Sequence, residues 1–224
     1  AWGLTDVGCT RAQNQDAFLI EKLDKNTLLC VVCDGMGGAK SGNVASTLAA
    51  EVFVEEVRQI FTPGMDPDDV EQMMRRAVKL ANFTVYDQAM QLEEFSGMGT
   101  TLVALLVQDQ EVPIVNVGDS RAYCIDRDGI SQITVDHSLV QMMVTRGELT
   151  PEQAKIYPGK NLITRAIGTE TTVHCDIFHK KVSKGDYFLR AGAVHFLADD
   201  FSHFIQRPHS ERKISIKASR GFFD

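Results

Sequence analysis

The sequence lacks the long apolar runs and the excess of positive charge that would indicate a membrane or a nucleic acid as a partner. None of its 224 residues lie in a stretch of 18 consecutive apolar residues, and the N-terminus lacks the charged-then-apolar order of a secretory signal. Acidic residues outnumber basic ones by 30 to 23, for a net charge of −7, whereas binding to phosphate backbones needs clustered Lys and Arg. We therefore expect neither kind of partner.

Cysteine is scarce and irregularly placed. The odd number and the absence of a regular framework are typical of free thiols in a reducing compartment, and the five residues are Cys9, Cys30, Cys33, Cys124 and Cys175. We therefore expect a cytoplasmic protein. Cys30 and Cys33 form a C-x-x-C pair inside an apolar run, and no second pair accompanies them, so burial in a strand is favoured over a zinc or redox site.

The order of apolar patterns predicts one α+β domain over residues 1–224. Helices are expected at 41–58 and 66–92, the second with Asp66 as its cap and an apolar stripe that includes Leu80. Two short helices, 138–146 and 150–155, and helical potential at 201–219 follow later in the chain. Expected strands are 16–21, 28–33, 101–107, 112–117, 121–125, 130–135, 172–179 and 187–189.

Three aspartates stand where a predicted strand meets a turn. Asp34 opens the run Asp34-Gly35-Met36-Gly37-Gly38, in which flexible glycines allow the main chain to approach a cation closely. Asp16 precedes another strand, and Asp119 lies in the turn Gly118-Asp119-Ser120-Arg121. A cluster of carboxylates is tolerable when divalent metals neutralise it, and oxygen ligands favour Mg²⁺ or Mn²⁺ over zinc. Alone, the Asp34 motif is equally compatible with a simple strand-to-helix turn.

These motifs, taken in order, resemble those of type 2C protein phosphatases, particularly the single-domain bacterial members. The resemblance runs from about Gly3 to Leu189. It is carried by Arg11 with Asn14-Gln15-Asp16-Ala17, by Asp34-Gly35-Met36-Gly37-Gly38, by Gly97-Met98-Gly99-Thr100-Thr101, by Gly118-Asp119-Ser120-Arg121-Ala122-Tyr123, by Asp136-His137-Ser138 and by Leu162-Ile163-Thr164-Arg165-Ala166-Ile167-Gly168. The resemblance implies a four-layer β-sandwich of two antiparallel sheets flanked by pairs of helices.

The resemblance also implies a site with two or three Mg²⁺ or Mn²⁺ ions. Asp34 would bridge the two main ions, the Gly35 carbonyl would bind one of them, and Asp16 would bind metal-bound water. Asp119 would serve a third, weaker metal. The implied metal residues are therefore Asp16, Asp34, Gly35, Asp119 and, near the end of the chain, Asp224.

The implied reaction is hydrolysis of phosphoserine and phosphothreonine in proteins by a metal-bridged water, made nucleophilic because the cations lower its pKa. Arg11 would hold the substrate phosphate, and the segment 138–155 would form a flap beside the site. His137 is a candidate general acid for the leaving alkoxide, and the alternative is that its ring satisfies a loop hydrogen bond.

Two departures from the family pattern bear on activity. Counting from Gly185-Asp186-Tyr187-Phe188-Leu189 puts Ala193 and Val194 where the family has a metal-binding Asp and a Gly. Alanine cannot ligate a metal, although Asp199 or Asp200 could be recruited instead. The resemblance also predicts a closing strand after Asp224, which this sequence does not contain.

Three functions therefore stay open. The first is an active metal-dependent protein phosphatase, supported by the set Arg11, Asp16, Asp34 and Asp119. The second is a pseudophosphatase that binds phosphoproteins without turnover, supported by Ala193 and Val194. The third is a hydrolase of small phosphorylated metabolites. The expected partners are phosphorylated proteins and a cognate protein kinase, and the expected state is a monomer.

Overall fold

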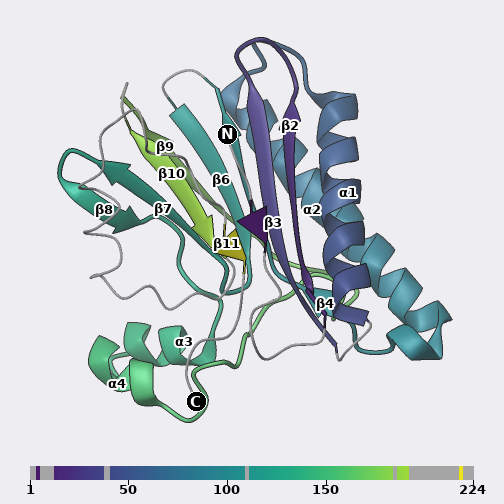
Figure 1. Cartoon of the computed structure of the whole chain (residues 1–224), viewed down its shortest axis with the longest axis vertical. Helices are drawn as coiled ribbons and strands as arrows, with labels where there is room; N and C mark the ends of the chain where they lie inside the picture. Colours follow the sequence, from purple (N-terminus) through teal and green to yellow (C-terminus); the bar gives the residue numbers. More distant parts are fainter. Residues whose placement is uncertain are drawn as a thin grey trace.

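Two β-sheets pack face to face in the computed structural model, which describes residues 4–5, 13–37, 41–108, 111–183, 186–191 and 217–218 (Figure 1). The first sheet has the order β2-β3-β5-β6-β9, with β4 paired to β3. Its strands are β2 (Asp16–Lys22), β3 (Leu28–Met36), β4 (Gly99–Thr100), β5 (Leu102–Val107), β6 (Glu111–Val117) and β9 (Asp176–Lys181). The second sheet consists, in order, of β1 (Leu4–Thr5), β11 (Lys217–Ala218), β10 (Tyr187–Ala191), β7 (Arg121–Asp126) and β8 (Gly129–Gln132).

Neighbouring strands run antiparallel throughout the first sheet and from β10 through β7 to β8 in the second. The two-residue strand β11 is the exception, because it pairs in parallel with both β1 and β10. The α+β class and the pair of antiparallel sheets expected from the sequence are thus confirmed.

Four α-helices and one short 3₁₀ helix complete the described fold. They are α1 (Ser41–Ile60), α2 (Pro67–Gln91), η1 (Glu93–Phe95), α3 (Leu139–Thr145) and α4 (Pro151–Ile156). The long helices α1 and α2 cover the outer face of the first sheet, and α3 and α4 lie beyond one end of the strands (Figure 1). Asp66 caps α2 as predicted, since its side chain accepts a hydrogen bond from the Asp68 amide.

Alternation along β3 divides its side chains between two apolar cores. Leu29, Val31 and Cys33 pack toward α1 and α2, whereas Cys30 and Val32 face the second sheet. Cys30 and Cys33 therefore point to opposite faces of one sheet, and both are buried. This arrangement explains the C-x-x-C spacing as core packing, because two side chains on opposite faces cannot share a disulfide or a zinc ion.

Three details of the predicted elements are wrong. Leu80 lies at the edge of the α2 stripe and is 39% exposed, whereas the other predicted members are buried. The segment 201–219 lies outside the described residues except for Lys217–Ala218, which form β11 rather than helix because pairing with β10 and β1 outweighs local propensity. The strand predicted at 172–179 begins only at Asp176. In the described part of the chain, no helix has both the length and the apolarity needed to cross a membrane.

Phe53 tests the helix-to-sheet core most directly because its side chain is fully buried on α1. We expect Phe53→Ala to lower the free energy of unfolding by about 3–5 kcal/mol, since the variant loses buried apolar surface and leaves a cavity. The matched control is Phe83→Ala on α2, where the ring is 62% exposed and the expected loss is within about 0.5 kcal/mol. Equilibrium urea unfolding measures both, and equal losses would contradict this description of the core.

Candidate active site

Asp16 and Asp34 lie directly opposite each other on neighbouring strands. In the β2–β3 ladder the two residues are Cα partners, so their α-carbons are about 4.5–5.5 Å apart and their side chains share one face. That face is the inner one, because Asp34 continues the alternation of Cys30 and Val32 and Asp16 that of Phe18 and Ile20. The fold thus brings two predicted site carboxylates together at one end of the space between the two sheets.

Gly35 is required by the close approach of three backbone segments. A Cβ atom at this position would lie 1.9 Å from the carbonyl oxygen of Gly42 in α1 and 2.5 Å from that of Gln15. The Gly35 amide donates a hydrogen bond of 2.9 Å to the Gln15 carbonyl, which fixes the strand end against β2. The glycine therefore allows the N-terminus of α1 to pack directly on the strand that carries Asp34.

A buried pair of hydroxyl groups connects the Asp34 strand to the turn that carries Asp119. The Asp34 amide donates to Thr101 Oγ1 at 3.0 Å, and the Thr101 amide donates to the Asp34 carbonyl at 3.0 Å. Thr101 Oγ1 and Ser120 Oγ lie 2.6 Å apart and share a further hydrogen bond. Thr101 and Ser120 are almost completely buried, so this bridge holds Asp119 near the same end of the sandwich.

Gly118 begins that turn with a backbone conformation that favours glycine. Its φ angle is +107°, and an added Cβ would lie 2.6 Å from the Cγ2 atom of Thr101. The Asp119 side chain that follows is buried, with 9% of its residue surface exposed. The turn therefore brings a third carboxylate to the site region without leaving it in bulk solvent.

The donors fit a hard divalent cation in chemical type. Two carboxylates opposed across a ladder repel each other, and a cation between carboxylate oxygens relieves that repulsion. Within residues 13–37, 41–108 and 111–183, however, no three His, Cys, Asp or Glu side chains gather closely enough to hold a metal ion. Several site candidates from the sequence lie outside the described residues: Arg11, Ala193, Val194, Asp199, Asp200 and Asp224.

His137 is buried at the centre of a hydrogen-bond network. Its Nδ1 atom accepts from the Gly118 amide at 3.0 Å, and its Nε2 atom lies 3.0 Å from Asp176 Oδ2. Arg165 Nη1 donates to Asp176 Oδ1 at 3.0 Å and lies 3.2 Å from His137 Nε2. Both ring nitrogens of His137 therefore contact other groups of the protein.

Burial and neighbouring charges shift the pKa values of His137, Asp176 and Arg121. Burial lowers the pKa of His137 below its ordinary value and the Arg165 charge adds to the effect, although the hydrogen bond to Asp176 opposes it. Burial alone would raise the pKa of Asp176, but hydrogen bonds from His137 and Arg165 hold it below its ordinary value. Burial works against the Arg121 cation, yet its hydrogen bonds with Asp136 raise the pKa of Arg121. Because its pKa is lowered, the His137 imidazole is neutral at neutral pH.

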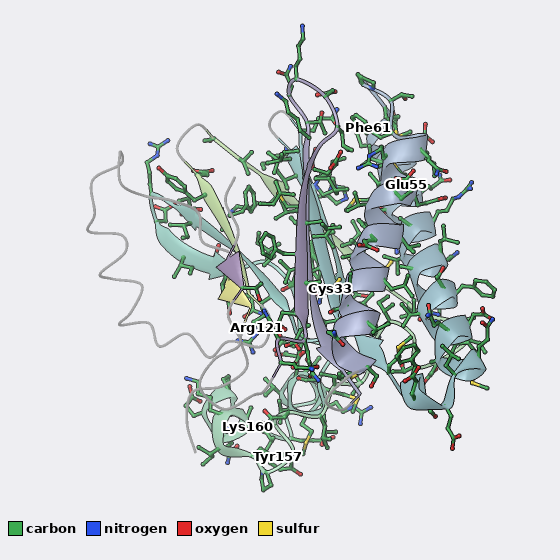
Figure 2. All side chains as sticks on the ribbon, turned by 45° about the vertical axis from the view of Figure 1, so that its right-hand side comes forward. Cys33, Glu55, Phe61, Arg121, Tyr157 and Lys160 are labelled. Carbon is green, nitrogen blue, oxygen red and sulfur yellow. The ribbon has the colours of Figure 1, made fainter. Side chains whose placement is uncertain are left out.

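Arg121 forms a two-point ion pair with Asp136 at this end of the sandwich. Its Nε and Nη2 atoms donate to both carboxylate oxygens of Asp136 at distances from 2.6 to 3.0 Å, and Gln132 also donates to Asp136. Figure 2 shows Arg121 near the ends of the strands, above the segment that carries Tyr157 and Lys160. This planar two-point contact fixes the residue that precedes His137.

The short helices α3 and α4 lie where the flap was expected, at the site end of the sandwich (Figure 1). Backbone hydrogen bonds from Leu139 to Leu162 and from Thr164 to His137 attach this segment to the site. A cavity of about 300 Å³ opens beside it, next to the end of β3. Its lining residues are Met36, Ile163, Thr164, Arg165, Ala166, Thr169, Glu170, Thr172, Val173 and His174.

Sequence reasoning missed the Asp176 carboxylate and the Thr101–Ser120 bridge. Asp176 contacts His137 across 39 positions of sequence, and no motif surrounds it. Thr101 and Ser120 both lie inside the quoted motifs, but their mutual contact depends on the β5–β6 pairing that brings their strand ends together. For Thr101, the available signal was a hydroxyl side chain at the start of the predicted strand 101–107.

Comparison with known proteins identifies similar protein phosphatases. Residues 10–150 match the family model described as Protein phosphatase 2C. The serine/threonine phosphatase stp of Listeria innocua is 32% identical over 217 residues, which cover 96% of this chain and 82% of that protein. Protein phosphatase PhpP of Streptococcus pneumoniae is 34% identical over 186 residues, covering 83% of this chain and 74% of that protein.

Solved structures give the same result. The crystal structure of serine/threonine phosphatase Stp1 from Staphylococcus aureus matches with a TM-score of 0.72 and 41% identity, covering 79% of this chain and 69% of that one. The serine/threonine phosphatase PstP/Ppp of Mycobacterium tuberculosis matches with a TM-score of 0.72 and 32% identity, covering 82% and 73%. Ordered motifs, two-sheet fold and relatives together show that this chain belongs to the protein phosphatase 2C family.

Proposed function

We propose that the chain is a Mg²⁺- or Mn²⁺-dependent phosphatase that hydrolyses phosphoserine and phosphothreonine in proteins. The observation that carries the proposal is the opposed pair Asp16 and Asp34 at the inner end of the sandwich. Its support from the comparisons is that three of the four relatives named above are serine/threonine phosphatases and the fourth is a protein phosphatase. The substrates would be phosphorylated proteins, with a cognate protein kinase as a further partner of a cytoplasmic monomer.

Each proposed site residue has a distinct task. Asp34 and the Gly35 carbonyl would hold the two main ions, Asp16 would bind metal-bound water, and Asp119 would serve a third ion. Bound cations would acidify water and offset the negative charge that develops on the phosphoryl oxygens. Arg11 would orient the substrate phosphate by two-point hydrogen bonding, and Asp224 would add a ligand. These last two assignments rest on sequence, since both residues lie outside the described part of the chain.

The chain's own residues would prepare the site for this reaction. The β2–β3 register keeps both carboxylates on one face of the sheet, so their positions would be largely set before charge develops on the substrate. The Thr101–Ser120 bridge fixes the Asp34 strand relative to the Asp119 turn. The α3–α4 segment beside the site would limit the approach of substrate and water.

Asp34→Asn tests the catalytic role. With Mn²⁺ present, we expect hydrolysis of p-nitrophenyl phosphate and of a phosphothreonine peptide to fall by at least about a hundredfold, because a cation at such a site supplies several kcal/mol of transition-state stabilisation. EDTA should abolish wild-type activity. The matched control is Asp87→Asn, an exposed aspartate on α2, which should retain wild-type rates.

The outcomes separate the three candidate functions. A well-folded wild-type chain without activity at millimolar Mn²⁺ would overturn the enzyme and favour the binding-only alternative that Ala193 supports. Hydrolysis of small phosphate esters without hydrolysis of the peptide would favour a metabolite hydrolase. Activity that persists in Asp34→Asn would contradict the proposed site itself.

Metal binding can be tested without turnover. We expect Mn²⁺ to raise the unfolding temperature of the wild-type chain in a concentration-dependent way, because a ligand that binds only the folded state stabilises it by mass action. Asp16→Asn and Asp34→Asn should each reduce that increase, and Asp87→Asn should not. The measurement is thermal unfolding followed by circular dichroism across a Mn²⁺ titration, and identical increases in all four proteins would argue against the proposed ligands.

A further inference from the structure

His137 joins three segments that are distant in sequence. Its backbone amide donates to the Gly118 carbonyl at 3.0 Å, while its ring nitrogen Nδ1 accepts from the Gly118 amide at 3.0 Å. Its carbonyl accepts from the Thr164 amide at 2.8 Å, and its Nε2 contacts Asp176 on β9. The N–H and the C=O of Gly118, which belong to two successive peptide units, are therefore both held by one buried residue.

The hydrogen bonds determine which ring nitrogen carries the proton. Because Nδ1 accepts from an amide N–H, which can only donate, Nδ1 has no proton of its own. The neutral ring then carries its proton on Nε2, which donates to Asp176 Oδ2. Arg165 Nη1, also a donor, contributes positive charge near Nε2 and its hydrogen bond goes to Asp176 Oδ1.

These contacts leave the ring ill-suited to proton transfer. A general acid must offer its proton to the leaving group, yet the Nε2 proton is committed to Asp176 and the Nδ1 lone pair to Gly118. The side chain of His137 is 5% exposed, so an approaching substrate oxygen meets little of the ring. What the ring does hold is the N–H of Gly118, in the peptide unit that joins Val117 to Gly118 one residue before Asp119.

We propose that His137 is a positioning residue that sets the Gly118 turn, and through it the direction of the Asp119 carboxylate toward a divalent cation. The inference rests on the proposed function, because it assigns Asp119 a cation. Asn116 Nδ2 donates to the same Gly118 carbonyl at 3.3 Å, and the Thr101–Ser120 bridge holds the turn from its other side. Among the residues that hold this turn, His137 also connects it to Asp176 and to the loop at Thr164.

Two amide substitutions separate the two ring contacts. In His137→Asn the side-chain oxygen stands near the position of Nδ1 and can still accept from Gly118, but the contact with Asp176 is lost. In His137→Gln the side-chain nitrogen reaches the position of Nε2 and can still donate to Asp176, but Gly118 loses its acceptor. Circular dichroism and urea unfolding establish that each variant is folded before any other comparison.

Mn²⁺ binding is the principal measurement, made by titration with the free Mn²⁺ signal in electron paramagnetic resonance. We expect His137→Gln to weaken the binding that Asp119→Asn also weakens, by about tenfold, as is typical when a buried donor loses its acceptor. We expect His137→Asn to stay within about twofold of wild type. In the Asp119→Asn background His137→Gln should have no further effect, because its effect passes through Asp119.

Three results would overturn the proposal. The first is additive losses in the double variant, and the second is equal losses from the Asn and Gln substitutions. The third is a wild-type binding curve that Asp119→Asn leaves unchanged, since Asp119 would then bind no cation. Wild-type hydrolysis of p-nitrophenyl phosphate, measured alongside, shows separately whether the proposed phosphatase function holds.

Two further readouts distinguish positioning from general acid catalysis. A general acid is needed by the poor alkoxide leaving group of a phosphothreonine peptide but not by p-nitrophenolate, whereas positioning predicts equal rate losses for the two substrates in His137→Gln. The ¹⁵N chemical shifts of the wild-type imidazole should show an unprotonated Nδ1 and a protonated Nε2. A larger loss for the peptide alone, or a proton on Nδ1, would contradict the inference.

Discussion

The site depends on one constraint, which is that two carboxylates stand opposite each other where an apolar core ends. The β2–β3 register that pairs Asp16 with Asp34 also pairs Phe18 with Val32 and Ile20 with Cys30, all on the same inner face. A slip of one residue would turn these apolar side chains out of the core together with the carboxylates. Burial of the core therefore fixes the position of the two carboxylates, and the proposed cations would offset the repulsion between their charges.

Other contacts hold α1 and the Gly118 turn in place relative to these two carboxylates. The missing side chain of Gly35 lets α1 pack on the strand end, and the Thr101–Ser120 bridge carries the alignment to the Gly118 turn. His137 holds that turn from the opposite side. Because every one of these contacts is buried, each is worth more than a surface hydrogen bond and leaves less freedom for the carboxylates.

Local patterns predicted most of the described fold. The helices α1 and α2 begin within one residue of the predicted positions because Ser41 and Asp66 are strong starting signals followed by apolar stripes. The carboxylates at strand ends were also predictable, since each precedes or follows an apolar run. The short strand at Lys217–Ala218 was not, because its conformation comes from pairing with β1 and β10 and not from its own sequence.

The relations between distant residues were harder to foresee. His137 was recognised as a motif residue, yet its partners Gly118 and Asp176 follow from how β6 and β9 lie beside each other. The same is true of Arg121, whose two-point contact with Asp136 joins two neighbouring motifs. Sequence motifs indicate which residue types gather at a site, but the tautomer and the task of each one depend on contacts that only the fold provides.

Anomalous X-ray scattering from crystals soaked in Mn²⁺ tests the central claim most directly, because it locates the ions without requiring turnover. The account predicts Mn²⁺ between the carboxylates of Asp16 and Asp34, at the inner end of the two sheets, with both residues in the register described. Crystals saturated with Mn²⁺ that show ions only elsewhere, with Asp34 remote from every one of them, would contradict it.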